Sequence, residues 1–157
     1  MRQLLLPSFA PTLLENLCEI GLPPAAIILE ITESVAQADT EFMTKRLKEL
    51  ADAGFTLAID DFGTGYSSLS QLHHMPVGKI KIDISFVRRV HETQGAELVQ
   101  AIIHMAEAFG LYTVAEGVED EKTALILQKY GVDFLQGYFF GKPMPAAEID
   151  SYLARVG

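Results

Sequence analysis

Acidic residues recur at the ends of short apolar segments, where they could bind a divalent metal. The strongest signal is the pair Asp60-Asp61, which closes the run FTLAIDD. Two adjacent carboxylates repel each other, and a cation beside them removes that cost. Glu30 and Glu116 end the similar runs IILE and LYTVAE. These four carboxylates form a candidate metal site suited to a phosphate ester, although Asp61 alone could instead cap the following turn.

Other polar side chains could complete this site. Lys81 and Lys79 lie two residues apart in KIKID, and we expect Lys81 to point inward while Lys79 faces solvent or an acidic partner. A lysine among carboxylates balances their charge or contacts the reacting phosphate or water. Gln136 ends the run VDFLQ. Glu30 could alternatively form a buried ion pair, and Glu33 could accept hydrogen bonds from a loop.

A repeating unit of helix, glycine and apolar strand must position these residues. The helical segments end at Gly21, Gly54, Gly110 and Gly131, where a left-handed residue commonly closes a helix. The strands that follow are continuous apolar runs, as is typical of parallel strands covered by helices. Within the helix 95–109 we expect Leu98, Ile102, Ala106 and Phe109 to form the buried stripe. Alternation of strand and helix predicts a parallel α/β fold.

The spacing of the polar strand ends favours a barrel. Five ends between Glu30 and Gln136 give about 26 residues per βα unit, and a full eight-unit barrel needs roughly 250 residues. We therefore expect about five of eight units. An open doubly wound sheet is the alternative, but it usually binds its ligand at one switch point.

The glycine-rich segment FGTGYSSL follows the Asp pair directly. It lacks the lysine and the spacing of a phosphate-binding P-loop. We interpret it as a loop with left-handed residues at Gly63 and Gly65 and a helix cap at Ser67 or Ser68.

Composition excludes several classes of protein. The 157 residues are 49% hydrophobic and 21% charged, which is typical of a globular domain. The net charge of −9 argues against binding a nucleic acid polymer. No apolar run is long enough for a membrane span, so we expect no membrane contact by this segment. The single cysteine, Cys18, fits a cytoplasmic location.

Five ordered motifs carry a resemblance to a known family: LEITES, DDFGTGYSSL, KIKID, VAEGVE and QGYFFGKPMP. In this order they resemble the EAL domain, the bacterial phosphodiesterase of cyclic di-GMP, over essentially the whole chain. The resemblance implies a modified TIM barrel that uses Mg²⁺ or Mn²⁺ to hydrolyse cyclic di-GMP to linear pGpG. We expect residues 1–157 to form a partial EAL domain of about five βα units.

The motifs also imply roles for single residues. Glu30 resembles a ligand of the first metal, and Asp60 resembles the carboxylate shared by both metals. Asp61 and Glu116 resemble second-metal or water-positioning groups, and Lys81 resembles the lysine that orients the nucleophilic water. The implied metal ligands are thus Glu30, Asp60, Asp61 and Glu116, with Lys81, Glu116 and Asp61 acting in catalysis.

Three further residues match the family outside the metal ligands. Gln136 resembles an active-site glutamine that contacts the substrate. Glu33 and Glu119 resemble residues that hold the loop after the Asp pair, and this loop lies near the dimer contact of the family.

The chain also departs from the family pattern. No Glu-Ala-Leu segment precedes LEITES, and the family's Asn-bearing strand and substrate-binding Arg are absent. We therefore expect a two-metal site short of two ligands, with little or no hydrolysis by this chain alone. Unpaired strand edges predict a homo-oligomer or a complementing chain.

Two other functions remain as alternatives. A non-catalytic module that binds cyclic di-GMP or a partner protein could derive from an EAL domain, although it would not need a metal shell. A metal-dependent barrel lyase of the enolase type also carries carboxylates and a lysine at its strand ends, but it would not carry these ordered motifs.

Overall fold

The computed structural model describes residues 6–36, 41–65 and 69–156. The strands are β1 Ile28–Thr32, β2 Thr56–Phe62, β3 Lys79–Ile82, β4 Tyr112–Ala115 and β5 Phe134–Leu135. The helices are α1 Phe9–Ile20, α2 Glu33–Ala36, α3 Glu41–Asp52, α4 Leu69–His74, α5 Ile84–Val87, α6 Thr93–Ala108, α7 Glu121–Tyr130 and α8 Ala146–Val156, with a short 3-10 turn at Pro24–Ala26. Within these residues, no helix has the length and apolar character to cross a membrane.

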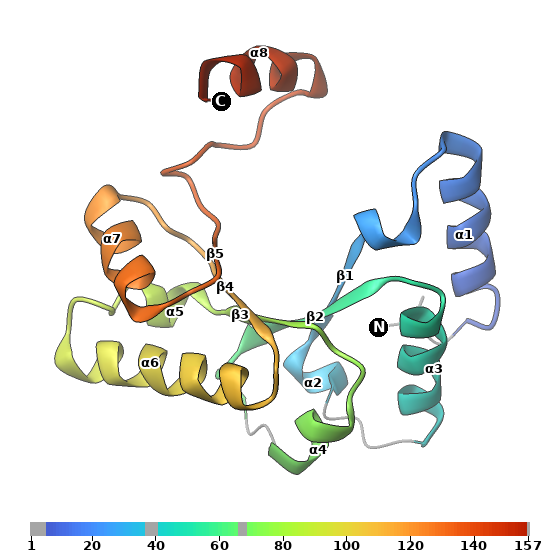
Figure 1. Cartoon of the computed structure of the whole chain (residues 1–157), viewed down its shortest axis with the longest axis horizontal. Coiled ribbons are helices and arrows are strands. Elements are labelled where there is room, and N and C mark those ends of the chain that lie inside the picture. Colours follow the sequence, from blue (N-terminus) through green and yellow to red (C-terminus); the bar gives the residue numbers. More distant parts are fainter. Residues whose placement is uncertain (1–5, 37–40, 66–68, 157) are drawn as a thin grey trace.

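The order of the strands identifies an arc of a βα barrel. All four strand pairs are parallel, and the strands lie side by side in chain order from β1 to β5. A doubly wound sheet would reverse its order at a switch point, so this alternative is excluded. Figure 1 shows α3, α4, α6 and α7 around the outer side of the curved sheet, while α8 stands apart at the end of an extended segment.

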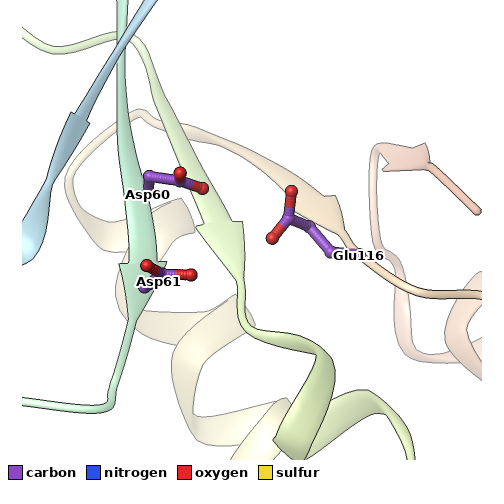
Figure 2. A group of neighbouring side chains, drawn as sticks. All are labelled: Asp60, Asp61 and Glu116. Carbon is purple, nitrogen blue, oxygen red and sulfur yellow. The ribbon is translucent and has the colours of Figure 1, made fainter.

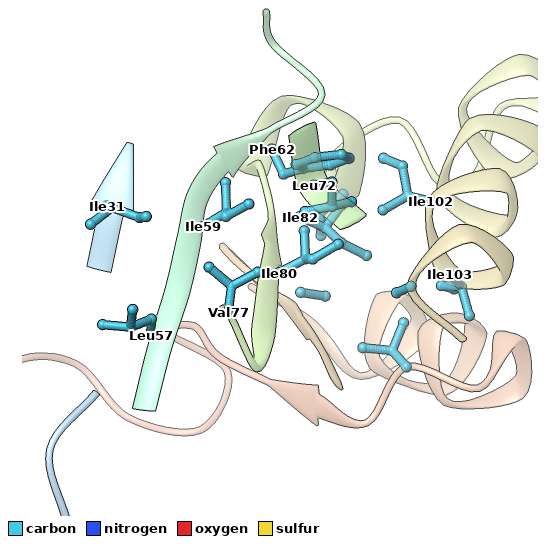
Figure 3. Packing of buried hydrophobic residues seen from close by; sticks show 14 of the residues in the cluster. Ile31, Leu57, Ile59, Phe62, Leu72, Val77, Ile80, Ile82, Ile102 and Ile103 are labelled. Atoms are coloured by element: carbon cyan, nitrogen blue, oxygen red, sulfur yellow. The ribbon is translucent and has the colours of Figure 1, made fainter. Parts of the chain in front are cut away.

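The hydrophobic core lies between the outer face of the sheet and the helices. Ile80 and Ile82 of β3 are fully buried there, with Ile103 of α6 close by (Figure 3). On the inner, concave face, Tyr112 is 56% exposed and Phe134 is 47% exposed. Burial alternates along β4, but β2 and β3 keep three buried residues in succession, so the expectation of helix-covered strands holds better for the middle of the sheet than for its edges.

The positions at which helices end were predicted correctly from the sequence, whereas the buried face of α6 was predicted only in part. Gly21, Gly54, Gly110 and Gly131 all have left-handed φ values just past a helix, as predicted. The predicted stripe on α6 is partly wrong, since Leu98 is 43% exposed and the neighbouring Val99 is fully buried. Ile102 and Ala106 are buried as predicted, so the buried face of α6 overlaps the predicted stripe but is centred closer to Val99 and Ile103. The expected cap at Ser67 or Ser68 lies outside the described residues.

A close backbone contact positions the chain after β5. The N–H of Val118 donates to the carbonyl of Gln136 at 3.1 Å, and the N–H of Phe139 donates to the carbonyl of Val118 at 3.0 Å. Between them, a Cβ on Gly137 would lie 2.1 Å from the Val118 oxygen. Because no side chain fits in this space, Gly137 is what allows this segment to reach the end of β4.

Gly137→Ala should therefore destabilise the fold by about 1–3 kcal/mol or more, as overpacking does. Gly78→Ala is the matched control, because a Cβ there would meet only Thr56 at an ordinary 3.7 Å, and its effect should stay below about 1 kcal/mol. Urea unfolding monitored by circular dichroism measures both changes. Equal midpoints for the two variants would contradict the proposed contact.

Candidate metal centre and adjoining pocket

An irregularity between β2 and β3 places the Asp60-Asp61 pair opposite Lys81. The register shifts there, so that the two aspartates of β2 face the single lysine of β3. Successive side chains of a regular strand point to opposite faces, but a bulge can redirect one of them. Asp61 also has a left-handed φ of 54°. Both carboxylates can therefore reach the same side of the sheet.

The two aspartates meet Glu116 on this side. One carboxylate oxygen from each of Asp60, Asp61 and Glu116 lies within 4.8 Å of the others. Figure 2 shows the aspartates on β2 and Glu116 just beyond β4, directed toward one another. The structure thus brings together three of the four metal ligands that the sequence predicted.

The expectation that the polar residues end their strands needs correction. Glu30 lies in the middle of β1, and Asp60 lies inside β2. Of the residues expected to end a strand and to act in the site, Glu116 and Gln136 do directly follow the last residue of one. The shared feature of these residues is the concave face of the sheet, since hydrogen-bonded neighbours in a parallel sheet project to the same side.

Lys81 lies at the centre of the carboxylate cluster, which consists of Glu30, Asp60, Asp61 and Glu116. Its ammonium lies 2.6 Å from Glu116 Oε1, 2.8 Å from Glu30 Oε2 and 2.9 Å from Asp60 Oδ1. The Lys81 side chain is only 7% exposed, whereas that of Glu30 is 46% exposed. Glu30 therefore joins the site through Lys81, and the single ammonium offsets one of the three carboxylate charges.

Lys79 lies on the same concave face, two residues before Lys81. Its ammonium sits 4.2 Å from the ring centroid of Phe134, within the range of a cation–π contact. This corrects the expectation that only one of the two lysines points inward. Residues two apart in a strand share a face.

Burial and crowding shift the acid–base properties of the site. Burial raises the pKa of Glu116, the Asp60 and Glu30 charges add to the shift, and Lys81 opposes it. Burial and the neighbouring Asp60 also raise the pKa of Asp61. For Lys81, burial lowers the pKa, but contacts with the Glu116, Glu30 and Asp60 carboxylates outweigh it, and the net shift is upward. The Lys81 ammonium therefore keeps its proton, while the raised pKa values of Glu116 and Asp61 mean that these two carboxylates hold a proton more readily than usual.

Glu33 supports the loop that follows the aspartate pair. Its side chain is buried, and its Oε2 accepts hydrogen bonds from the N–H groups of Gly63 and Gly65, both at 3.1 Å. Gly63 has a φ of 96°, and a Cβ there would lie 2.9 Å from the Phe86 ring. This is the position that the resemblance implies for Glu33, and its effect on activity remains a prediction.

A pocket of about 360 Å³ opens beside Glu116. Its lining includes Gln136, the backbone of Gly117 and Gly137, and the ring of Tyr138. Gln136 is exposed in this lining, so a ligand that reaches Glu116 can also reach its amide. Contact between Gln136 and a substrate remains a prediction.

Glu119 lies on the wall of the same pocket, away from the loop that it was expected to hold. Its Oε1 accepts a hydrogen bond from Arg88 Nη2 at 3.0 Å, and both side chains are more than half exposed. The structure therefore corrects the expected contact of Glu119. The two glutamates differ because Glu33 follows β1 directly, whereas Glu119 lies in the loop between β4 and α7.

Sequence reasoning gave no role to Asp83 or Arg88. Asp83 caps α5 by accepting a hydrogen bond from the Ser85 N–H at 2.9 Å, and it also contributes to the raised pKa of Asp61. Asp83 directly follows an apolar strand, as Glu116 does. The same sequence signal that identified Glu116 could therefore have identified Asp83. Arg88 gave no such signal, because only the fold brings it to the pocket.

The donor atoms of the cluster fit a hard divalent cation. Asp60 Oδ1 is buried and accepts no hydrogen bond of good geometry from the described part of the chain, although Lys81 Nζ lies 2.9 Å away. A buried acceptor without a hydrogen bond is costly. All candidate ligands are carboxylate oxygens, which Mg²⁺ and Mn²⁺ prefer over softer donors.

The sequence matches the EAL domain family over residues 1–143. It is 38% identical over 155 residues to the cyclic di-GMP phosphodiesterase PdeR of Escherichia coli K12, covering 98% of this chain and 23% of PdeR. The chain spans about a fifth of the length of the curated relatives that it matches.

Solved structures of EAL domain proteins are also similar to this chain. The EAL domain of Mycobacterium smegmatis DcpA is 43% identical with a TM-score of 0.87, covering 95% of this chain and 67% of that chain. Klebsiella pneumoniae BlrP1, solved as a complex with manganese and cyclic di-GMP, is 37% identical with a TM-score of 0.80, covering 88% of this chain and 35% of BlrP1.

Lys81→Met should destabilise the metal-free protein by about 3 kcal/mol, the low end for breaking a buried ion pair, because Glu30 is half exposed. Added Mg²⁺ should restore part of this loss, since a cation again balances the carboxylates. Lys79→Met is the matched control on the same strand face, and it should cost about 1 kcal/mol or less. Urea unfolding with chelator and with Mg²⁺ measures these values. An equal loss in both variants, or no recovery with Mg²⁺, would contradict the role of Lys81 as counter-charge.

Proposed function

Because the chain belongs to the EAL domain family, we propose that it carries the metal- and phosphate-binding part of a cyclic di-GMP phosphodiesterase. The reaction is hydrolysis of cyclic di-GMP to linear pGpG. The observation that carries the proposal is the convergence of Asp60, Asp61 and Glu116 within 4.8 Å beside Lys81. Relatives named as cyclic di-GMP phosphodiesterases and a structural neighbour solved with manganese and cyclic di-GMP support it.

In this proposal the four carboxylates of Glu30, Asp60, Asp61 and Glu116 hold two Mg²⁺ or Mn²⁺ ions. When bound, such ions offset the charge of the phosphate and lower the pKa of a bound water. The need for them follows from the charge of the molecule. A chain with a net charge of −9 repels an anionic diester unless cations lie between the two.

In this proposal Lys81 and Glu116 both act on the water that attacks the phosphate. The raised pKa of Lys81 keeps its ammonium protonated, so Lys81 orients the attacking water by donating a hydrogen bond and does not act as a base. Glu116, which would hold a metal ion, would also help to position that water. The oxygen of the water adds to phosphorus, the P–O3′ bond breaks, and a proton released by the water ends on O3′, so the product carries a 5′-phosphate and a 3′-hydroxyl. Gln136 donates to the substrate from the pocket wall.

Residues 1–157 form a partial EAL domain in this proposal, and hydrolysis by the polypeptide alone is slow. The half-exposed Glu30 supports slow turnover, because water around the site weakens its electrostatic interactions. A cytoplasmic location is consistent with Cys18, an exposed thiol on α1 that a reducing compartment would preserve.

We expect the chain, with Mn²⁺, to convert cyclic di-GMP to pGpG more slowly than the cyclic di-GMP phosphodiesterase PdeR. Asp60→Asn should reduce this turnover at least tenfold, because it removes a carboxylate from the centre of the site. Asp52→Asn is the control, since Asp52 is an exposed carboxylate at the end of α3. Chromatography of the nucleotides after incubation measures the product. Metal-dependent turnover that survives Asp60→Asn would contradict the assigned site, and turnover equal to that of PdeR would contradict slow hydrolysis.

The exposed concave face supports a further proposal, association with a second copy or with a complementing chain. Strands β1 and β5 are the edges of the described sheet. Ile28, Tyr112 and Phe134 lie at register positions of its inner face and are 45%, 56% and 47% exposed. Exposed apolar side chains beside unpaired strand edges favour association.

Light scattering should then report a molar mass that rises with protein concentration. Phe134→Glu places a charge on the concave face and should shift this rise to higher concentration. Leu125→Glu is the matched control, since Leu125 is 58% exposed on α7, and it should leave the rise unchanged. A constant monomer mass at high concentration would contradict the association.

A further inference from the structure

A series of hydrogen bonds outside the carboxylate cluster links His91, Thr123 and Asp120. Asp120 caps α7: its Oδ1 accepts a hydrogen bond from the Thr123 N–H at 2.8 Å, and its Oδ2 accepts one from the Thr123 hydroxyl at 3.0 Å. His91 lies between α5 and α6, and its Nε2 is 2.9 Å from the same hydroxyl oxygen. Side chains 32 positions apart in the sequence therefore meet at the start of α7.

The chemistry of the three groups fixes the direction of these bonds. The backbone and hydroxyl hydrogen bonds from Thr123 lower the pKa of Asp120, and the nearby His91 adds to this shift. The Asp120 carboxylate is therefore ionised and can only accept. A threonine hydroxyl has one proton, which Thr123 gives to Asp120. Its oxygen can then only accept from His91, so the Nε2 atom of His91 carries a hydrogen.

This arrangement does not activate a nucleophile. In a Ser-His-Asp triad the imidazole lies between the hydroxyl and the carboxylate and takes the hydroxyl proton. Here the hydroxyl lies between the other two groups and donates to the carboxylate. Thr123 is also only 5% exposed, so a substrate could not approach its hydroxyl. The three residues therefore hold segments of the chain in place.

The contact joins two segments that begin in the candidate metal centre. One runs from Lys81 through α5 to His91, and the other runs from Glu116 to Asp120, four positions later. At their starts the segments are linked by the ion pair of Lys81 Nζ and Glu116 Oε1 at 2.6 Å. At their ends they are linked by the hydrogen bond from His91. This bond therefore closes a ring of contacts that includes Glu116.

Close packing leaves little freedom on either side of the contact. A Cβ on Gly95 would lie 2.0 Å from the Arg89 carbonyl oxygen, so the turn that carries His91 is fixed against α6. A Cβ on Gly117 would lie 2.2 Å from the Ile84 side chain, so the other segment is fixed against α5. Because neither segment can yield easily, a single hydrogen bond can determine how the two meet.

We propose that His91 is a positioning residue for Glu116 and acts through Thr123 and the cap of α7. The inference rests on the proposed function, because the position of Glu116 matters to the reaction only if its carboxylate holds a metal ion. His91 touches neither the ion nor the substrate. It fixes the direction from which the Glu116 carboxylate approaches the ion.

Calorimetry with Mg²⁺ tests this role. His91→Leu removes the donor and should lower the affinity of the folded chain for Mg²⁺ about three- to tenfold, less than the roughly 10–100-fold typical when a direct partner of a metal ligand is lost. His91→Gln can donate from its amide to Thr123 and should restore most of the affinity. His104→Leu is the matched control, since His104 is exposed on α6, and it should leave the affinity unchanged.

NMR and unfolding separate positioning from stability. The Nε2–H of His91 should give a visible proton signal in the unaltered chain, because its hydrogen bond slows exchange with water, and the signal should vanish in Thr123→Val. Thr123→Ser keeps the hydroxyl and should keep both the signal and the Mg²⁺ affinity. A merely structural role would lower the urea midpoint of His91→Leu and leave the Mg²⁺ affinity of the folded chain unchanged.

Unchanged Mg²⁺ affinity in folded His91→Leu would overturn the proposal, and so would equal losses in His91→Leu and His91→Gln. A missing Nε2–H signal in the unaltered chain would contradict the assigned direction of the hydrogen bonds. If the folded, unaltered chain binds no Mg²⁺, the proposed function fails together with this inference. Equal Mg²⁺ binding by the unaltered chain and all the variants would reject the role of His91 alone.

Discussion

The ion cluster around Lys81 is the interaction on which the rest of the site depends. One ammonium, almost fully buried, lies within 2.9 Å of carboxylates from Glu30, Asp60 and Glu116. Those carboxylates come from β1, β2 and the end of β4, so a single side chain from β3 links four strands. Without the positive charge, the carboxylates would repel one another across the concave face. The same arrangement that holds the protein together without metal also collects the ligands that a metal would need.

The fold positions this cluster by giving the two faces of the sheet different environments. Apolar side chains on the outer face of the sheet pack against helices such as α6, and the core does not extend to the inner face. The inner face is therefore free to carry charge, and the shifted register at Asp60-Asp61 brings two successive carboxylates to it. Glu33 and Gly63 then fix the loop that leaves this pair. The register shift and the hydrogen bond from Gly63 to Glu33 are local features. Together they hold acidic side chains close to one another despite their repulsion.

The charge of the chain bears on how it could bind the anionic dinucleotide on which relatives in its family act. A protein with a net charge of −9 has little attraction for an anionic dinucleotide, so the local cations matter. Lys81 lies in the carboxylate cluster, and Arg88 lies on the wall of the adjoining pocket. The two differ in surroundings, since Lys81 is enclosed by carboxylates and Arg88 has one exposed partner. Lys81 therefore holds the carboxylates of the site together, whereas the Arg88 side chain stays largely open to solvent.

The sequence by itself determined the parallel α/β class, the five strands, the glycine helix ends and the acidic residues of the site, because these follow from periodicity, local backbone preferences and ordered motifs. It also favoured a barrel over a doubly wound sheet, through the polar strand ends and the ordered motifs, but the strand order itself was seen only in the tertiary structure, because it depends on contacts between distant segments. It wrongly included Leu98 in the buried face of α6, because the edge of that face is set by what packs against it. It also did not find the contact of Glu119 with Arg88, because a partner about 30 positions away leaves no local pattern. Only the tertiary structure decided that Asp60 and Asp61 face one side, because the register shift that turns them arises from pairing with β3.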